Sequence, residues 1–96
     1  MDESILYDRS RLEIMTVLAT SSDKMSFNEL LQRTNLTKGN LSSHLKKLED
    51  QKYVVMEKSF IGRIPLTTII ISRHGKEVFK SHLEGMQKLL KKISNK

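Results

Sequence analysis

The sequence contains no cysteine, one proline and few aromatic residues, and each shortage narrows what the protein can be. Without cysteine, neither a disulfide framework nor a thiolate metal site can support a small fold. Aromatic residues make up 5% of the chain, which provides no platform on which RNA bases would stack. No apolar run approaches the ~18 residues that a membrane-spanning helix needs. The acidic N-terminus, MDESILYDRS, does not resemble a signal peptide, so we expect a soluble cytoplasmic protein.

The sequence motifs of common enzyme classes are also missing. There is no phosphate-binding glycine loop, no dinucleotide fingerprint and no nucleophile with an evident base. His74, His82 and Glu84 share the last predicted helix, but their spacing does not suit a metal ion. We therefore expect no enzymatic activity, no metal and no other cofactor.

Length and charge favour one small domain with a polyanionic partner. A chain of 96 residues is near the lower limit for burying its own core, and oligomerisation is a common remedy. The net charge is +6 with a pI near 9.7. This charge is uneven, because residues 1–20 sum to −2 whereas residues 73–96 sum to +5.

The stretch from Ser26 to Lys52, SFNELLQRTNLTKGNLSSHLKKLEDQK, contains two helix starts. Ser26 and Glu29 have the spacing of a reciprocal capping box, which would satisfy two amides at a helix start. Thr34-Asn35 interrupts that first helix, and Thr37 can cap a second one. A short helix, a tight turn and another helix are typical of a helix-turn-helix.

The second helix has two different faces. Leu41, Leu45 and Leu48 recur at helical spacing and predict one buried stripe. The opposite face is small, polar and basic, with the members Gly39, Ser42, Ser43 and Lys46. Such a face fits a DNA groove, but the same pattern also suits an ordinary helical hairpin with a solvated outer side.

Strand-like sequence surrounds this stretch. Residues 53–58 and 66–71 are rich in β-branched side chains, which predicts two strands. The segment between them, SFIGRIP, contains Gly62 and Pro65, so we predict a β-hairpin with a loose tip. We also expect a first helix starting near Asp8 or Ser10, and a short strand at residues 25–27.

The final predicted helix, capped by Ser72, has a heptad-like apolar seam that suggests a dimer interface. The alternative is that this helix packs only on its own domain, but the seam continues to Ile93, which is followed by three residues. The candidate dimerisation residues are Phe79, Leu83, Met86, Leu89, Leu90 and Ile93.

The order of these elements is the winged helix-turn-helix plan, and two stretches resemble a known family. LTKGNLSSHLKKLEDQKYV is similar to the helix-turn-helix core of MarR- and ArsR-type transcriptional regulators. GRIPLTTIIISRHGKEVF is similar to the wing and following helix start in small one-domain members. The fold expected is α+β, mainly α, with a two-stranded wing and a long C-terminal dimerisation helix. We expect one domain over 1–96, with a core at 10–73 and that helix at 73–94.

The resemblance implies a homodimer that binds double-stranded DNA and regulates transcription, with no membrane partner. Its recognition helix, 38–51, would lie in the major groove, and Arg63 at the wing tip would lie in or near the minor groove. The candidate DNA-binding residues are Thr37, Lys38, Gly39, Asn40, Ser42, Ser43, Lys46, Lys47 and Arg63. The alternative is a winged-helix module that binds protein and not DNA.

Two departures from the family pattern affect these expectations. Lys52 stands where such regulators usually have glycine, so we expect the recognition helix to end without a left-handed cap. The recognition face has no arginine, and only Asn40 offers a bidentate base contact. We therefore expect a palindromic, A·T-containing site that is read without great stringency. The sequence does not indicate the operator, the regulated genes or an effector.

Overall fold

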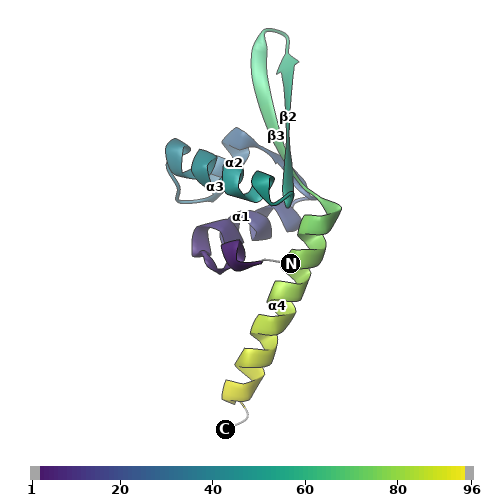
Figure 1. Ribbon diagram of the computed structural model, residues 1–96. Coiled ribbons are helices and arrows are strands. Elements are labelled where there is room, and N and C mark those ends of the chain that lie inside the picture. Colours follow the sequence, from purple (N-terminus) through teal and green to yellow (C-terminus); the bar gives the residue numbers. More distant parts are fainter. Residues whose placement is uncertain (1–2, 95–96) are drawn as a thin grey trace.

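The computed structural model describes residues 3–94 and combines helices with a small antiparallel sheet (Figure 1). In chain order, the elements are η1 (Ser4–Tyr7), α1 (Arg9–Ala19), β1 (Lys24–Ser26), α2 (Phe27–Arg33), α3 (Lys38–Asp50), β2 (Val54–Ile61), β3 (Ile64–Ile71) and α4 (Arg73–Ser94). The β2–β3 hairpin and α4 project from the helical body in opposite directions, and the longest dimension is 58 Å. This is the winged-helix fold predicted from the sequence. The short 3-10 helix η1 was not predicted.

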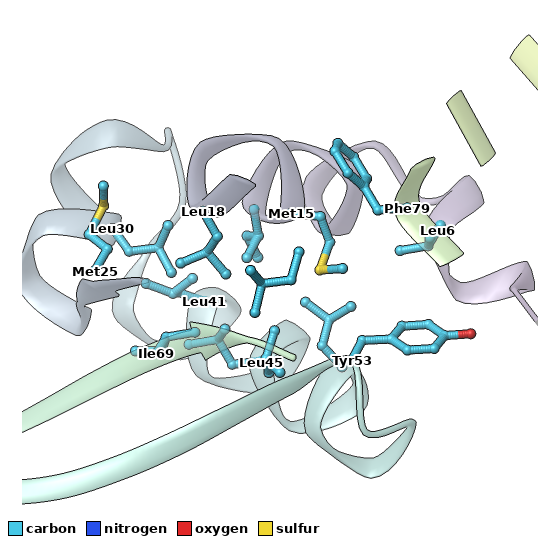
Figure 2. Close-up of a cluster of buried hydrophobic side chains, with 14 of the residues drawn as sticks. Leu6, Met15, Leu18, Met25, Leu30, Leu41, Leu45, Tyr53, Ile69 and Phe79 are labelled. Atoms are coloured by element: carbon cyan, nitrogen blue, oxygen red, sulfur yellow. The ribbon is translucent and has the colours of Figure 1, made fainter. Parts of the chain in front are cut away.

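The core lies between the helices and one face of the sheet. The strand order is β1-β3-β2, so β3 is central and β2 is at an edge. Side chains from α1, α2 and α3 point toward those of β3 and the start of β2 (Figure 2). The fully buried members include Leu6, Ile14, Met15, Leu18, Leu30, Leu41, Leu45, Leu48, Tyr53, Val54 and Ile69. The apolar periodicities read from the sequence therefore mark the core faces of these elements.

The hairpin is tighter than predicted. Strands β2 and β3 pair without interruption up to Ile61 opposite Ile64, which leaves only Gly62 and Arg63 in the turn. Gly62 has φ +63°, as the first central position of a type II′ turn requires. Pro65 is tolerated because it lies beyond the reach of β1, where β3 has a free edge. The prediction of a loose tip at residues 59–65 was wrong, because a proline in such a position does not interrupt pairing.

Helix starts follow the predicted caps with one difference. Asp8 accepts a hydrogen bond from the amide of Arg11 (3.0 Å), and Thr37 accepts one from the amide of Asn40 (3.1 Å). At α2, Ser26 accepts from the Glu29 amide (3.2 Å), but Ser26 donates its own hydroxyl to the Glu29 carboxylate (3.1 Å). The capping box therefore closes on the serine side chain. The predicted strand at 25–27 is one residue earlier, at Lys24–Ser26, and Phe27 begins α2.

The end of α3 contradicts the expectation about Lys52. This residue has φ +63°, which is the left-handed conformation that glycine adopts most easily. The amide of Lys52 donates to the carbonyl of Glu49 (2.8 Å), and that of Tyr53 donates to Leu48 (3.0 Å). These two bonds define a Schellman motif with lysine at the usual glycine position. The helix therefore does end in a left-handed cap, and Lys52 carries the backbone strain.

The start of α4 is fastened to the end of α3. Ser72 accepts from the amide of Gly75 (2.9 Å), as its predicted capping role requires, and donates to the carbonyl of Lys52 (2.7 Å). A Cβ atom on Gly75 would collide with the backbone carbonyl of Tyr53, so only glycine fits there. Lys76 adds an ion pair with Asp23 (2.6 Å). Among the described residues, no helix is long and apolar enough to cross a membrane.

Candidate nucleic-acid interface

Helix α3 presents its polar face to solvent because its leucine stripe is fully used by the core. Leu41, Leu45 and Leu48 are 0%, 1% and 0% exposed. Every residue predicted to contact DNA from this region is exposed: Thr37, Lys38, Gly39, Asn40, Ser42, Ser43, Lys46 and Lys47. No heavy atom lies within 4 Å of the position that a Cβ of Gly39 would occupy. The structure therefore brings these eight residues together on one open surface, which we call the α3 face.

A contact between α3 and α1 fixes the orientation of the α3 face. The half-buried His44 approaches Arg11, with 3.2 Å between Nδ1 of the imidazole and Nη1 of the guanidinium. Because arginine has no acceptor, Arg11 donates and Nδ1 accepts, which places the histidine proton on Nε2. Arg11 also donates from Nε to the carbonyl of Ile5 (2.7 Å). His44 is thus a half-buried residue at the boundary between the leucine stripe and the α3 face.

The same cluster carries a shifted carboxyl group at the start of α1. The hydrogen bond from the Arg11 amide lowers the pKa of Asp8 below its usual value, although partial burial opposes this. The positive charge of Arg11 lowers the pKa of Asp8 further. Asp8 therefore holds the helix start as an anion, and α1 in turn supports the orientation of α3.

The C-terminal end of the α3 face contains a carboxylate that sequence reasoning missed. Asp50 follows Lys46 by one helical turn, and their side chains form an exposed ion pair of 3.1 Å. The hydrogen bond to Asp50, and then its charge, raise the pKa of the Lys46 ammonium above its usual value. An exposed pair of this kind contributes little to stability, so a phosphate can compete for Lys46. The spacing of four residues was the available signal for this pair.

The wing adds a second exposed basic surface. Arg63 lies at the tip of the hairpin, in the two-residue turn, and is exposed as predicted. Lys58 was not among the candidates, yet it belongs to the wing side that faces the helices. Strand alternation from the buried Val54 places Lys58 on that side, four residues further along. The period of two in the sequence would have identified it.

The apolar seam of α4 divides into a buried and an exposed part. Phe79 is only 8% exposed and belongs to the domain's own core. From Leu83 onward the exposure rises, from 38% at Leu83 to 69% at Ile93. The exposed residues, which we call the α4 stripe, are Leu83, Met86, Leu89, Leu90 and Ile93. The α4 stripe lies away from the core, on the part of the helix that projects from the body (Figure 1).

The histidines of α4 have structural neighbours. His82 is buried, and its ring meets that of Tyr7 in an edge-on contact with centroids 5.1 Å apart. Its Nδ1 lies 3.8 Å from the carboxylate of Glu3. The His74 ring packs against Tyr53, with centroids 5.4 Å apart. Within residues 3–94, no group of three or more His, Cys, Asp or Glu side chains could hold a metal ion.

The fold and the exposed α3 face define a class of protein, and sequence comparison agrees with it. The chain belongs to the family of winged helix DNA-binding domains, whose family model matches residues 10–90. The resemblance to small winged helix-turn-helix regulators of the MarR/ArsR group is thereby confirmed at the level of a winged helix DNA-binding domain. A family of DNA-binding domains also agrees with the expectation that this protein is not an enzyme.

Individual proteins resemble the chain over most of its length. It is 39% identical over 84 residues to the uncharacterised protein MJ0432 of Methanocaldococcus jannaschii, covering 86% of this chain and 89% of that protein. It is similar to a transcriptional regulator homologue from Pyrococcus horikoshii OT3, with a TM-score of 0.89, 31% identity and coverage of 97% and 91%. A PadR family transcriptional regulator from Eggerthella lenta shares the fold, with a TM-score of 0.71, 16% identity and coverage of 85% and 78%.

Proposed function

We propose that this protein is a transcriptional regulator that binds double-stranded DNA as a homodimer and selects its site by sequence. The observation that carries the proposal is the α3 face, which is small, hydrogen-bonding and basic in a winged helix DNA-binding domain. Gly39 and Ser43 leave room for the helix backbone to approach a groove closely. As a regulator of transcription, the protein would act in the cytoplasm.

In this proposal, α3 lies in the major groove with its N-terminal part nearest the bases. Thr37, Lys38 and Lys47 lie at the edges of the α3 face and would contact phosphates. Lys46 would do the same once it exchanges Asp50 for a phosphate oxygen. Ser42 and Ser43 can donate to or accept from base edges, but serine distinguishes bases weakly. Asn40 supplies the one amide side chain on α3 suited to an adenine. The α3 face therefore favours modest sequence readout supported by many phosphate contacts.

The wing would contribute through Arg63. Its guanidinium lies at the end of a tight hairpin, where the described residues of the core give it no packing role. Arginine is drawn to narrow A·T-rich minor grooves, where the negative potential is strongest. We expect Arg63 to favour A·T-containing flanks over G·C-containing ones, and Lys58 to meet the adjacent phosphates.

The proposed dimer forms through α4. Beside the α4 stripe is an open pocket of about 340 Å3, lined by Ala19, Lys76, Glu77, Phe79, Lys80 and Leu83. Large apolar residues that remain exposed along one helix face, next to a pocket, are typical of an interface between subunits. Phe79 closes the proximal end of this surface. A symmetric dimer would present two α3 helices to half-sites about one DNA turn apart.

The experiment that tests DNA binding measures affinity for random-sequence duplex over a range of salt concentrations. A regulator that contacts several phosphates loses affinity steeply, with each contact adding about 0.9 to the log–log slope. Lys46→Ala should weaken binding to all duplexes and reduce the slope by about one. Lys24→Ala is the matched control, because Lys24 lies in β1 next to the core residue Met25, on the sheet face turned away from the helices.

Three outcomes separate the alternatives. Salt-dependent binding with a reduced slope for Lys46→Ala supports the proposal. An unchanged slope removes Lys46 from the interface. Wild-type protein that does not bind duplex at low salt contradicts DNA binding and favours the protein-interaction module. Selection of sites from random duplex would then give the operator of a protein that does bind.

A further inference from the structure

The wing tip is apolar on both faces, which the roles assigned so far do not explain. Phe60, Ile61 and Ile64 are 71%, 65% and 70% exposed, and Pro65 is exposed as well. Phe60 pairs with Pro65 on the face turned toward the helices, and Ile61 pairs with Ile64 on the other. None of the four belongs to the hydrophobic core cluster. The only cation of the turn, Arg63, therefore lies among four apolar side chains.

The folded monomer does not account for these side chains. The two-residue turn and the uninterrupted pairing already fix the register of the hairpin, and threonine would fit the same strand positions. Exposed apolar residues at a hairpin end instead create a risk of aggregation, which proteins usually reduce with polar residues. A partner that covers the tip would explain why they are apolar.

Charge and shape indicate what that partner is. From Lys58 to Thr67 the sequence contains two cations and no carboxylate. The hairpin narrows to a two-residue turn, so its tip can approach a minor groove, which is about 6 Å wide. With its apolar side chains the tip is wider than the groove, so it would have to widen the groove in order to enter. Proteins that bind in the minor groove combine arginine with apolar wedges that open a base step and bend the duplex.

We propose that the wing tip is an apolar wedge for the DNA minor groove. Ile61 and Ile64 enter the groove on either side of Arg63 and widen it at a deformable base step. This inference rests on the proposed DNA binding and adds a specificity element to it. Pyrimidine–purine steps such as TpA deform easily, whereas A-tracts are stiff and narrow. The wedge therefore selects flexible A·T sequence over rigid A·T sequence, which an arginine alone would not do.

Two synthetic duplexes of identical composition test this selection without knowledge of the operator. Alternating poly(dA-dT) contains TpA steps, and poly(dA)·poly(dT) contains none. Wild-type protein should bind the alternating duplex about tenfold more tightly, a difference well within the energies of duplex deformation. It should also shorten the end-to-end distance of an alternating duplex labelled for energy transfer.

Matched variants assign this preference to particular side chains. The double variant Ile61→Thr/Ile64→Thr keeps β-branched residues in the strands and should lose both the preference and the bend. Val55→Thr is the control, because Val55 is an exposed apolar residue on the same face of β2 but far from the tip. It should behave like wild type. Arg63→Ala should weaken binding to both duplexes and retain the preference.

The outcomes distinguish failure of the wedge from failure of DNA binding. Wild-type protein that binds both duplexes equally, or a double variant that keeps the preference, overturns the wedge and leaves DNA binding intact. Wild-type protein that binds neither duplex overturns both. If the double variant lowers the oligomeric state in the absence of DNA, the tip covers a second copy of the chain and the wedge is wrong. Each variant should have the same thermal unfolding temperature as wild type, which would show that its fold is intact.

Discussion

Helices α3 and α4 have similar apolar patterns in the sequence, but the apolar stripe of α3 is buried in the folded chain and that of distal α4 is exposed. In α3, the three leucines of the stripe are fully buried by α1 and the sheet. In α4, the same kind of spacing continues past the edge of the core, and Leu90 is 61% exposed. The α3 stripe is buried by other parts of the same chain. The distal α4 stripe is not covered by any part of the described structure.

This difference shows what a periodic apolar pattern reports. It says that one side of a helix is apolar, but not which surface covers that side. Because the α3 stripe is covered within the chain, its polar face is held outward in a fixed orientation and can serve a ligand. Because the α4 stripe is not covered within the chain, we infer that a second copy of the chain covers it. The first stripe should therefore affect the stability of the fold, and the second the oligomeric state.

The largest effect, on the stability of the fold, is expected from a substitution in the buried leucine stripe of α3. Leu45→Ala leaves a cavity between α3 and the sheet, and a fully buried leucine lost in this way typically costs about 2–5 kcal/mol. Much of the stability of so small a domain would be lost. Thermal or denaturant unfolding at several protein concentrations measures this. A loss below about 1 kcal/mol would contradict the assignment of Leu45 to the core.

The stripe that we assign to a second chain should respond differently. Leu90→Ser/Ile93→Ser removes two exposed side chains, each of which would gain about 1.5–3 kcal/mol on full burial in a dimer. The dimer dissociation constant should therefore rise at least about a hundredfold, while the helical content of the domain is retained. Sedimentation at several concentrations measures this rise.

A control variant and DNA binding extend the same test. Lys92→Ser changes a neighbouring residue outside the α4 stripe and should leave the association unchanged. The double variant should also bind a two-half-site operator far more weakly, because the two α3 helices would no longer be linked. Wild-type protein that stays monomeric at high micromolar concentration would show that the α4 stripe serves another purpose.

Local signals were sufficient to predict most of the fold. Asp8, Ser26, Thr37 and Ser72 cap the predicted helices because capping depends on residues within one turn. The β-branched runs became β2 and β3. The exposed α3 face followed in turn from the leucine spacing, so the candidate site was recognisable before its surroundings were known.

Contacts between distant residues account for what the sequence did not reveal. The contact between Arg11 and His44 joins residues 33 positions apart, and nothing near either of them indicates it. The requirement for glycine at position 75 comes from the backbone of Tyr53, which only the folded chain brings close. The left-handed conformation of Lys52 likewise follows from the turn into β2, and it overrides the local preference of lysine. Whether DNA contacts the predicted residues is a property of the complex.

A smaller effect, with opposite signs for folding and binding, is expected on the open side of α3. Gly39→Ala should stabilise the fold by about 0.4–1 kcal/mol, because no heavy atom opposes the new methyl group and the unfolded chain loses freedom. If the α3 backbone approaches DNA at this point, the same methyl group should weaken binding. Gly85→Ala is the matched control, since its Cβ position in α4 is also open. It should stabilise the fold without weakening binding, and a Gly39→Ala protein that binds normally would remove the close approach.

An effect of similar small size concerns the residue that ends α3 and so sets where its leucine stripe stops. Lys52 has φ +63°, a conformation that costs a residue with a Cβ about 1–2 kcal/mol, whereas glycine adopts it freely. Glycine also makes the unfolded chain more flexible, which offsets roughly half of that gain. Lys52→Gly should therefore stabilise the domain by about 0.5–1 kcal/mol in denaturant unfolding. Lys52→Ala removes the same charge but keeps the Cβ, so it should give no comparable gain. Equal stabilisation by both variants would assign the effect to the lost charge, and the strain at this helix end would then be insignificant.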